Sequence, residues 1–230
     1  MTSVRRVERE WLDELPAEDP RAVRSRRDLR RVNALMSNAP IVAAALRPAG
    51  AGLRRVAEIG AGDGTFALRL ARALPRPAAQ AEFVLVDRQP VIDAGLERQF
   101  ADLGWRARWQ RADVFEWLRS PEACRCDAIV ANLFLHHFED RPLTELLRLA
   151  AGRAPLFIAC EPRRSAFALL GSRLLGLIGC NDVTRHDAVA SVRAGFRGRE
   201  LTRLWPESAS HGLDERPRGL FSHGFVARAP

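Results

Sequence analysis

The sequence of 230 residues contains no lysine, so all 36 of its basic residues are arginines. Set against 28 acidic residues, they give a formal net charge of +8, which by itself would suit a partner rich in phosphate. Acidic residues are, however, interleaved with the arginines along nearly the whole chain, and alanine is also abundant. We therefore interpret the charge as a composition bias and do not expect nucleic acid as a partner.

The chain also lacks long apolar runs and a cysteine framework. No stretch approaches the roughly 20 apolar residues that a membrane helix needs, and the first ten residues mix arginine with glutamate, unlike a signal peptide. The four cysteines are too few and too irregular for a set of disulfides, and Cys124-Arg-Cys126 does not have the spacing of a zinc half-site. We expect a soluble cytoplasmic protein with reduced thiols, no membrane span and no metal site.

The chain changes character near residue 54. Before that point Val23, Leu29 and Val32 recur at helical spacing, and Pro40 separates this run from a second apolar helix. We expect residues 1–53 to form an N-terminal helical cap. From residue 54 short apolar runs alternate with helical stretches, which is typical of βαβ units and a parallel sheet.

This alternation predicts the fold class of the second part, residues 54–230. We expect an α/β, Rossmann-like domain with a seven-stranded, mostly parallel sheet and helices on both faces. An insertion over about residues 163–196 would cover the substrate. The predicted strands are 54–59, 82–87, 107–110, 127–132, 156–161, 200–205 and 219–227, and the predicted helices are 64–74, 91–102, 141–152, 165–178 and 185–194.

A glycine-rich turn follows the first predicted strand. Glu58-Ile-Gly60-Ala61-Gly62-Asp63-Gly64 ends that strand and opens a helix, and its glycines permit a tight turn and a close approach of a ligand to the backbone. Three glycines alone are also compatible with an ordinary strand-to-helix turn. The residues around them decide between these readings.

The acids of the turn separate two kinds of nucleotide ligand. A nicotinamide dinucleotide site would have its third glycine where this chain has Thr65, and would place pyrophosphate at the helix N-terminus. Asp63 and Glu58 would repel pyrophosphate, but they suit a ligand that carries an ammonium and a sulfonium and no phosphate. The charge pattern therefore indicates S-adenosylmethionine rather than NAD.

Two further acids end the second and third predicted strands. Asp87, followed by Arg88, stands about twenty residues after the glycines, where a carboxylate accepts hydrogen bonds from both ribose hydroxyls. Asp113 offers an acceptor for the adenine amino group, with Val114 as an apolar neighbour of the ring, although an acid in this place is also a common helix N-cap. The sequence thus offers acids at three successive strand ends.

Residues 54–161 resemble a class I S-adenosylmethionine-dependent methyltransferase, of the group similar to ubiquinone and menaquinone methyltransferases. The resemblance implies that Glu58 and the three glycines hold the methionine part of the cofactor, Asp87 its ribose and Asp113 its adenine. The cofactor-binding residues expected on these grounds are Glu58, Gly60, Ala61, Gly62, Asp63, Gly64, Asp87, Arg88, Asp113, Val114 and Asn132.

The segment after the fourth predicted strand, Asn132-Leu-Phe-Leu-His136-His137-Phe138, points into the ligand crevice of such a sheet. It differs from the Asn/Asp-Pro-Pro-aromatic tetrad of methyltransferases that act on nucleobase amino groups, and it resembles small-molecule methyltransferases. We therefore expect O- or C-methylation of a small, largely apolar hydroxylated aromatic or quinone-like compound. An RNA or protein methyltransferase, or a cofactor-binding protein without turnover, is the alternative, and the sequence leaves the oligomeric state open.

Histidines are the natural general bases for a hydroxyl acceptor because their ordinary pKa is near 6.5. His136 and His137 lie in the crevice loop, where either one could instead cap the next helix or pack. His186 lies in the insertion and could instead stand at a surface helix start capped by Thr184. Glu161, at the end of the fifth strand, faces the same crevice or pairs with Arg163 or Arg164. The catalytic candidates are His136, His137 and His186.

Overall fold

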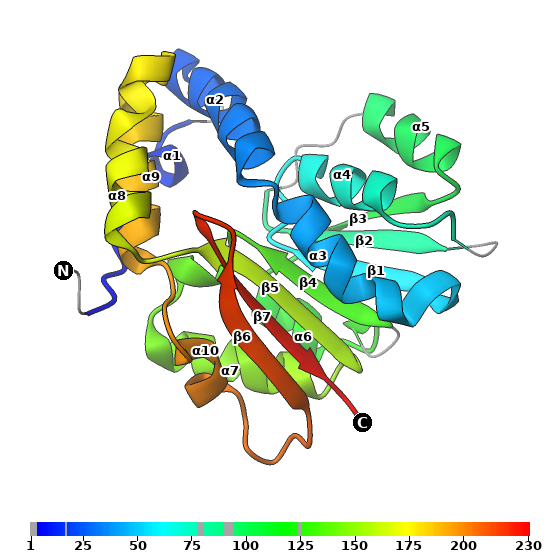
Figure 1. Ribbon diagram of the computed structural model, residues 1–230. Coiled ribbons are helices and arrows are strands. Elements are labelled where there is room, and N and C mark those ends of the chain that lie inside the picture. The colour runs from blue at the N-terminus through cyan, green and yellow to red at the C-terminus, as the bar shows by residue number, and fades with distance from the viewer. Residues whose placement is uncertain (1–3, 17, 78–80, 90–93, 124–125) are drawn as a thin grey trace.

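The computed structural model describes residues 4–16, 18–77, 81–89, 94–123 and 126–230. At its centre is a seven-stranded sheet with the order β3-β2-β1-β4-β5-β7-β6 (Figure 1). The strands are β1 (Arg55–Ile59), β2 (Glu82–Asp87), β3 (Arg106–Arg111), β4 (Ala128–Asn132), β5 (Leu156–Pro162), β6 (Gly212–Arg218) and β7 (Ser222–Arg228).

The first five strands run parallel to one another, as predicted from the βαβ pattern. Strand β7 is antiparallel to both β5 and β6, so the sheet is mixed at this edge. The strand order reverses between β1 and β4, since β2 and β3 follow on one side of β1, whereas β4 and β5 lie on the other. A parallel sheet of this kind binds ligands outside the carboxyl ends of its strands at that point. The site is therefore expected beyond the ends of β1 and β4.

One predicted strand is wrong. Residues 200–205 form a short helix, α10 (Glu200–Leu204), because Leu201 and Trp205 are four residues apart and both face the core at helical spacing. The sixth strand is instead Gly212–Arg218, which carries few apolar residues and pairs only with β7.

Helices cover both faces of the sheet, and each face has its own apolar core. Helices α6 (Val114–Arg119), α7 (Asp140–Ala151) and α10 pack on one face, and α3 (Asn38–Leu46), α4 (Thr65–Ala73) and α5 (Ala94–Asp102) on the other. In β1, Val56 belongs to one core and its neighbour Ala57 to the other, since successive side chains point to opposite faces. The start of the predicted helix at 91–102 lies partly outside the described residues.

The N-terminal region divides into two parts. Helix α3 and the 3-10 segment η1 (Arg47–Gly52) follow the sheet, and α3 is buried against α4, β5 and β7. Helices α1 (Trp11–Glu14) and α2 (Pro20–Met36) instead pack against α9 (Asp182–Ala194) beyond the carboxyl end of β5 (Figure 1). Only α1 and α2 therefore form the cap that the sequence predicted for residues 1–53.

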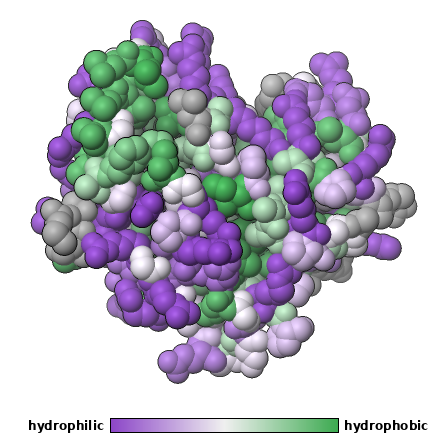
Figure 2. Space-filling view, in the orientation of Figure 1, coloured by the Kyte–Doolittle hydropathy of each residue, from purple (hydrophilic) through white to green (hydrophobic). Residues whose placement is uncertain are grey.

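The apolar run after β5 is largely exposed and does not pack into the core. It forms α8 (Ala166–Arg173) and the 3-10 segment η4 (Leu174–Ile178), and five of its large side chains are exposed: Phe167, Leu170, Leu174, Leu177 and Ile178. Figure 2 shows this apolar surface over α8. In the part of the chain that the structure describes, no helix has both the length and the apolar character to cross a membrane.

Candidate functional site

The glycine turn links β1 to α4 and has a backbone that only glycine adopts without strain. Gly60, Gly62 and Gly64 have φ angles of 72°, 54° and 70°, and the amides of Gly60 and Ala61 donate to the Val86 carbonyl of β2. A methyl group added at Gly60 would lie 2.2 Å from the ring of Phe134. The turn is therefore held against β2 on one side and the loop after β4 on the other.

Glu58 is the penultimate residue of β1, next to this turn, and is 2% exposed. Burial raises the pKa of its carboxyl well above the usual value, and the nearby charges of Asp63 and Asp87 raise it further. Among the described residues, its Oε2 atom has no hydrogen-bond partner. A buried carboxylate oxygen without a donor fits the ammonium group of S-adenosylmethionine, which would supply both a donor and a positive charge.

Asp87 binds the glycine turn directly. Its Oδ2 accepts a hydrogen bond from the Gly62 amide at 2.8 Å, and its Oδ1 accepts one from the Gln89 amide at 2.8 Å. The carboxylate is thereby fixed beside the turn with lone pairs left for ribose hydroxyls. Asp63 accepts from the Thr65 amide and lies 3.4 Å from Arg30 of α2, while Arg88 is exposed.

Asp113 stands at the end of β3 as the N-cap of α6. Its Oδ1 accepts hydrogen bonds from the amides of Phe115 and Glu116, and Val114 is buried next to it. The N-cap alternative considered for the sequence is therefore present. It does not exclude an adenine contact, because a carboxylate has two oxygens and several lone pairs.

Asn132 ends β4 and is held by the N-terminal region. Its Oδ1 accepts from Asn38 Nδ2 at 2.8 Å, and Asn38 Oδ1 accepts from Ser222 Oγ at 2.6 Å. The next residue, Leu133, has a φ of 51°, a left-handed conformation that costs a non-glycine residue on the order of 1 kcal/mol or more. This bend turns the loop after β4 towards Gly60.

That loop places aromatic rings beside the glycine turn. Phe134 packs on Gly60 and is edge-on to Phe138 with ring centroids 5.1 Å apart, and Phe138 is edge-on to Phe115 of α6 at 5.7 Å. An apolar surface therefore connects the turn to the helix that Asp113 caps. Such a surface suits a flat, apolar ring.

His136 lies between two carboxylates in the 3-10 segment η3 (Leu135–His137). Its Nδ1 is 2.8 Å from Oε2 of Glu161, and its Nε2 is 3.5 Å from Oε1 of Glu10. Burial opposes a charge on this ring, but the two carboxylates raise the pKa of His136 to about 9. Burial likewise opposes a charge on Glu10, whose pKa is nevertheless lowered to about 2 by His136.

Glu161 therefore pairs with His136 rather than with either arginine that follows it. Its Oε1 also accepts from the amides of Phe134 and Leu135 at 3.0 and 2.9 Å. Arg164 instead contacts Glu200 and the Gly195 carbonyl. The buried carboxylate of β5 thus fixes both the ring of His136 and the backbone of the loop.

His137 and His186 are less enclosed than His136. Burial lowers the pKa of His137 and the neighbouring His136 lowers it further, while Asp13 lies 4.0 Å from its Nδ1. His186, on α9, stacks on Trp11 with ring centroids 3.9 Å apart and has its Nδ1 3.0 Å from Asp187. The helix start is capped by Asn181, whose side chain accepts from the Thr184 amide, rather than by Thr184, which was the alternative considered for this segment.

The N-terminal segment, residues 4–14, brings these histidines together. Asp187 accepts from the amides of Trp11 and Leu12, and Arg5 donates to the Phe138 carbonyl and to Asp140. This places α1 over the crevice loop. The sequence did not indicate Glu10, Asp13 or Asn38, because each belongs to the site only through contacts with residues far away in the chain.

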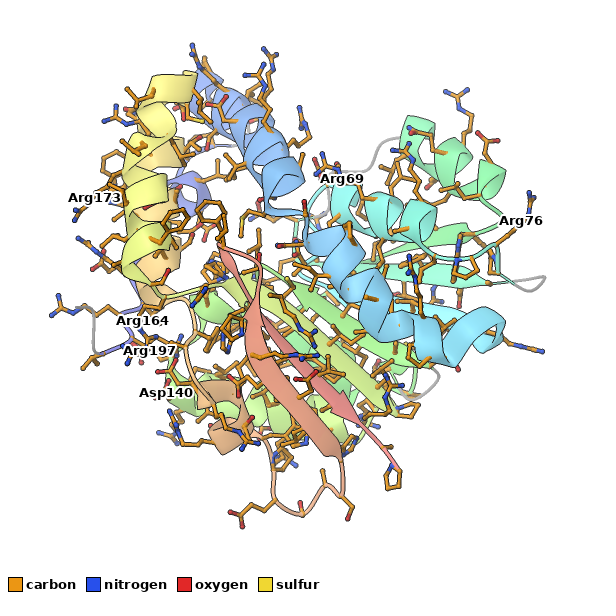
Figure 3. The ribbon with its side chains drawn as sticks, viewed as in Figure 1. Arg69, Arg76, Asp140, Arg164, Arg173 and Arg197 are labelled. Atoms are coloured by element: carbon orange, nitrogen blue, oxygen red, sulfur yellow. The ribbon has the colours of Figure 1, made fainter. Side chains whose placement is uncertain are left out.

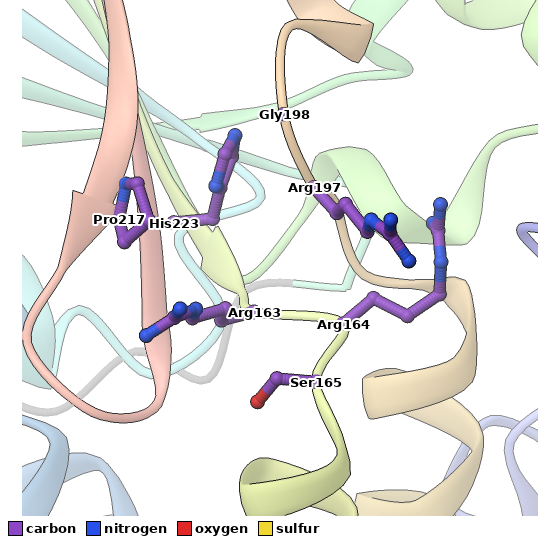
Figure 4. Close-up of a pocket in the computed structure, with 7 residues that line it drawn as sticks. All are labelled: Arg163, Arg164, Ser165, Arg197, Gly198, Pro217 and His223. Atoms are coloured by element: carbon purple, nitrogen blue, oxygen red, sulfur yellow. The ribbon is translucent and has the colours of Figure 1, made fainter. Parts of the chain in front are cut away.

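Two hollows of the described surface lie away from the glycine turn. One, of about 340 Å³, is lined by Arg163, Arg164, Ser165, Arg197, Gly198, Pro217 and His223 (Figure 4). The other, of about 470 Å³, includes Trp11 and His186. The turn nevertheless has the features expected of a cofactor site, namely three glycines in the left-handed conformation and the unpartnered Glu58 oxygen.

Residues 56–152 match a family model described as a methyltransferase domain. No curated protein matches the sequence. The match starts in β1 and ends after α7, so it includes the glycine turn, Asp87, Asp113 and the histidine loop.

Solved structures share the fold at low sequence identity. An O-methyltransferase family protein from Burkholderia thailandensis is 18% identical with a TM-score of 0.60, covering 93% of this chain and 61% of its own. Human N-acetylserotonin methyltransferase, solved with S-adenosylmethionine, is 14% identical with a TM-score of 0.58, covering 96% and 63%. A plantazolicin methyltransferase bound to S-adenosylhomocysteine is 12% identical with a TM-score of 0.64, covering 93% and 92%. The chain thus spans less than two thirds of the first two structures.

Proposed function

We propose that this chain, whose residues 56–152 match a methyltransferase domain, uses S-adenosylmethionine to methylate a small, largely apolar aromatic or quinone-like compound on a hydroxyl group. C-methylation of a related ring is the close alternative. The observation that carries the proposal is the position of the loop after β4, which sets Phe134 against Gly60 and His136 and His137 directly behind it. The names of two structural neighbours, an O-methyltransferase and N-acetylserotonin methyltransferase, agree with such an acceptor.

The proposed cofactor site follows the strand ends. Glu58 and the turn from Gly60 to Gly64 would hold the methionine part, Asp87 with Arg88 beside it the ribose, and Asp113 with Val114 the adenine. Asn132 would line the methionine end, fixed in place by Asn38. The likeness to ubiquinone and menaquinone methyltransferases belongs to this proposal, as does the role of residues 163–196 as a cover for the acceptor.

In methyl transfer the main role of the protein is to align the acceptor with the methyl group of the cofactor. The bound cofactor supplies an electrophilic methyl group on sulfur, so the acceptor oxygen forms a bond to that carbon as the carbon–sulfur bond breaks. The hydroxyl proton must leave at the same stage. The groups nearest to the crevice loop that bind protons are His136, His137 and their carboxylates, so we assign acceptor activation to this cluster, with His186 as the more distant candidate.

The distribution of arginines favours a small acceptor over RNA. Figure 3 shows Arg164 and Arg197 close together but Arg69 and Arg76 on another part of the molecule, so the labelled arginines do not follow one groove. Several arginines also pair with acids, for example Arg148 with Glu145 and Arg218 with Asp214. A polyanion needs a continuous basic track, and a formal charge of +8 does not by itself provide one.

A cytoplasmic location is part of the proposal. Cys126, Cys160 and Cys180 are buried free thiols, as expected in a reducing compartment. Burial raises the pKa of the Cys126 thiol to about 12, so this thiol is unreactive at neutral pH.

Methyl transfer from S-adenosylmethionine labelled in its methyl group tests the acceptor class. We expect label to enter the organic-soluble fraction with hydroxylated aromatic or hydroxyquinone acceptors, and not with the same compounds after their hydroxyls are blocked. Label in RNA or protein, together with a mobility shift of RNA at low salt, would favour the alternative. Retention of the cofactor without transfer to any acceptor would indicate a binding protein without turnover.

A further inference from the structure

We infer that Glu10, His136 and His137 form a binding site for one divalent transition-metal ion, with zinc as the best match to these ligands. Each residue offers one ligand atom, and the three atoms all lie within 4.8 Å of one another. Two histidines and one glutamate are a known ligand set for zinc in sites that keep a further position open. The expectation of no metal site rested on the cysteine spacing and could not include Glu10, which the fold brings from the N-terminal segment.

The spacing of two donor atoms fits an ion better than a hydrogen bond. His136 Nε2 and Glu10 Oε1 are 3.5 Å apart, longer than a normal N–H···O contact of about 2.9 Å. Two donors that each lie about 2.0–2.1 Å from a tetrahedral ion are separated by roughly 3.3 Å. A small movement of the Glu10 side chain therefore completes this part of the coordination shell.

Nδ1 of His136 contacts a buried carboxylate, as the nitrogen that does not bind the metal commonly does in metal-bound histidines. A carboxylate can only accept, so the contact of 2.8 Å with Glu161 places a hydrogen on Nδ1. Nε2 faces Glu10, and a metal ion would displace the hydrogen of the protonated ring from this nitrogen and bind its lone pair. Glu161 is itself fixed by the Phe134 and Leu135 amides. A buried carboxylate behind a histidine fixes the ring and makes it a stronger ligand.

The charges around the cluster favour a cation. Glu10, Glu161 and Asp13 contribute three carboxylates, and Asp13 is 4.0 Å from His137 Nδ1. Ser191 donates a hydrogen bond to Glu10 and orients it from α9. Arg88 interacts with Asp13 and opposes the negative charge in part. An ion of charge +2 would offset the carboxylates that remain.

The ion would have one structural role and one chemical role. It would join Glu10 to His136 and His137, and so tie the N-terminal segment to the crevice loop. At its open position it would bind the acceptor oxygen and lower the pKa of that hydroxyl, which supplies the activation step of the methyl transfer. This role rests on the proposed function, whereas binding of the ion does not.

Titration with Co²⁺, whose absorption reports its ligands, followed by competition with Zn²⁺, tests the site in the full chain. We expect one saturable Co²⁺ site in the unaltered protein, displaced by Zn²⁺. Glu10→Gln and His137→Gln should each weaken Co²⁺ binding at least about tenfold, because each removes one of three ligands. Glu8→Gln is the matched control, since Glu8 is exposed, pairs with Arg193 and should leave the affinity unchanged.

Absence of a saturable site for Co²⁺ and Zn²⁺ in the unaltered protein, or equal affinity in the unaltered protein and both ligand variants, would overturn the inference. Circular dichroism without metal checks that the variants are folded. If Glu10→Gln does not fold, His137→Gln still provides the test. Binding of S-adenosylhomocysteine is measured on the same samples. If the unaltered protein does not bind S-adenosylhomocysteine, the proposed function is contradicted and the metal result still stands. If it binds S-adenosylhomocysteine but no metal, the metal inference is contradicted and the proposed function still stands.

Discussion

Asp87→Ala is expected to weaken the binding of S-adenosylhomocysteine by at least about a hundredfold. The substitution removes the proposed acceptor for two ribose hydroxyls, and a hydrogen bond to a charged group contributes about 1.5–3 kcal/mol. Two such bonds correspond to a factor of about 100 or more, since about 1.4 kcal/mol is tenfold. It also leaves the Gly62 amide without its partner, which loosens the glycine turn. Isothermal titration calorimetry measures the effect.

Asp102→Ala is the matched control for this experiment. Asp102 is an exposed acid at the end of α5, so its loss changes the net charge equally without touching the turn. We expect the control to bind S-adenosylhomocysteine as the unaltered protein does. An Asp87→Ala protein that is folded and keeps full affinity would show that the ribose lies elsewhere.

Glu215→Ala is expected to lower the free energy of unfolding by about 3 kcal/mol or more, because each buried donor left without an acceptor costs about 1–3 kcal/mol. Glu215 on β6 accepts from the Leu201 and Thr202 amides, from the Thr202 hydroxyl and from His223 Nε2 at 2.9 Å. The side chains of Glu215 and His223 are fully buried. The substitution leaves these donors without an acceptor and removes the link between α10 and the sheet edge.

Urea denaturation measures this loss, with the exposed Glu207→Ala as control. Burial opposes a charge on Glu215, but His223 and the Thr202 and Leu201 donors lower its pKa. Because the folded pKa is below the unfolded value, the stabilisation is present above about pH 4.5 and is lost as the pH falls through the folded pKa. A difference below about 1 kcal/mol at neutral pH would contradict the role assigned to this residue.

The parallel part of the sheet could be predicted from the sequence because its signals are local. Each of β1, β2, β4 and β5 is a short apolar run followed by a helix, and the glycines and acids stand at their ends. A parallel strand that is buried on both faces of the sheet requires such an apolar run, so the runs predict the strands. The residues that follow each run then predict the position of the crevice.

The antiparallel edge could not be predicted in the same way. Strand β6 contains Asp214, Glu215, Arg216 and Pro217, and only its pairing with β7 and its ties to α10 and His223 hold it in the sheet. Its polar pattern is that of a loop. Residues 200–205 have apolar residues at positions 201, 204 and 205, which is helical spacing, but a segment this short has too few of them to distinguish one helical turn from a strand.

The residues of the candidate site likewise fall into those that local sequence predicts and those that depend on long-range packing. Glu58, Asp87 and Asp113 were accessible from the sequence because strand ends meet at one edge of a parallel sheet. The partners of the histidines were not, because Glu10 and Asp13 reach His136 and His137 only through the packing of α1 on α9. Long-range polar contacts of this kind leave no periodic signal in the chain.

Binding of S-adenosylhomocysteine to the purified, unaltered protein is the most direct test of the account. The acids at the ends of β1, β2 and β3 and the unpartnered oxygen of Glu58 predict saturable binding at one site, measured by isothermal titration calorimetry. NAD, which carries a pyrophosphate, should give no binding, since Glu58 and Asp63 would repel it. An absence of heat with both S-adenosylmethionine and S-adenosylhomocysteine would contradict the account.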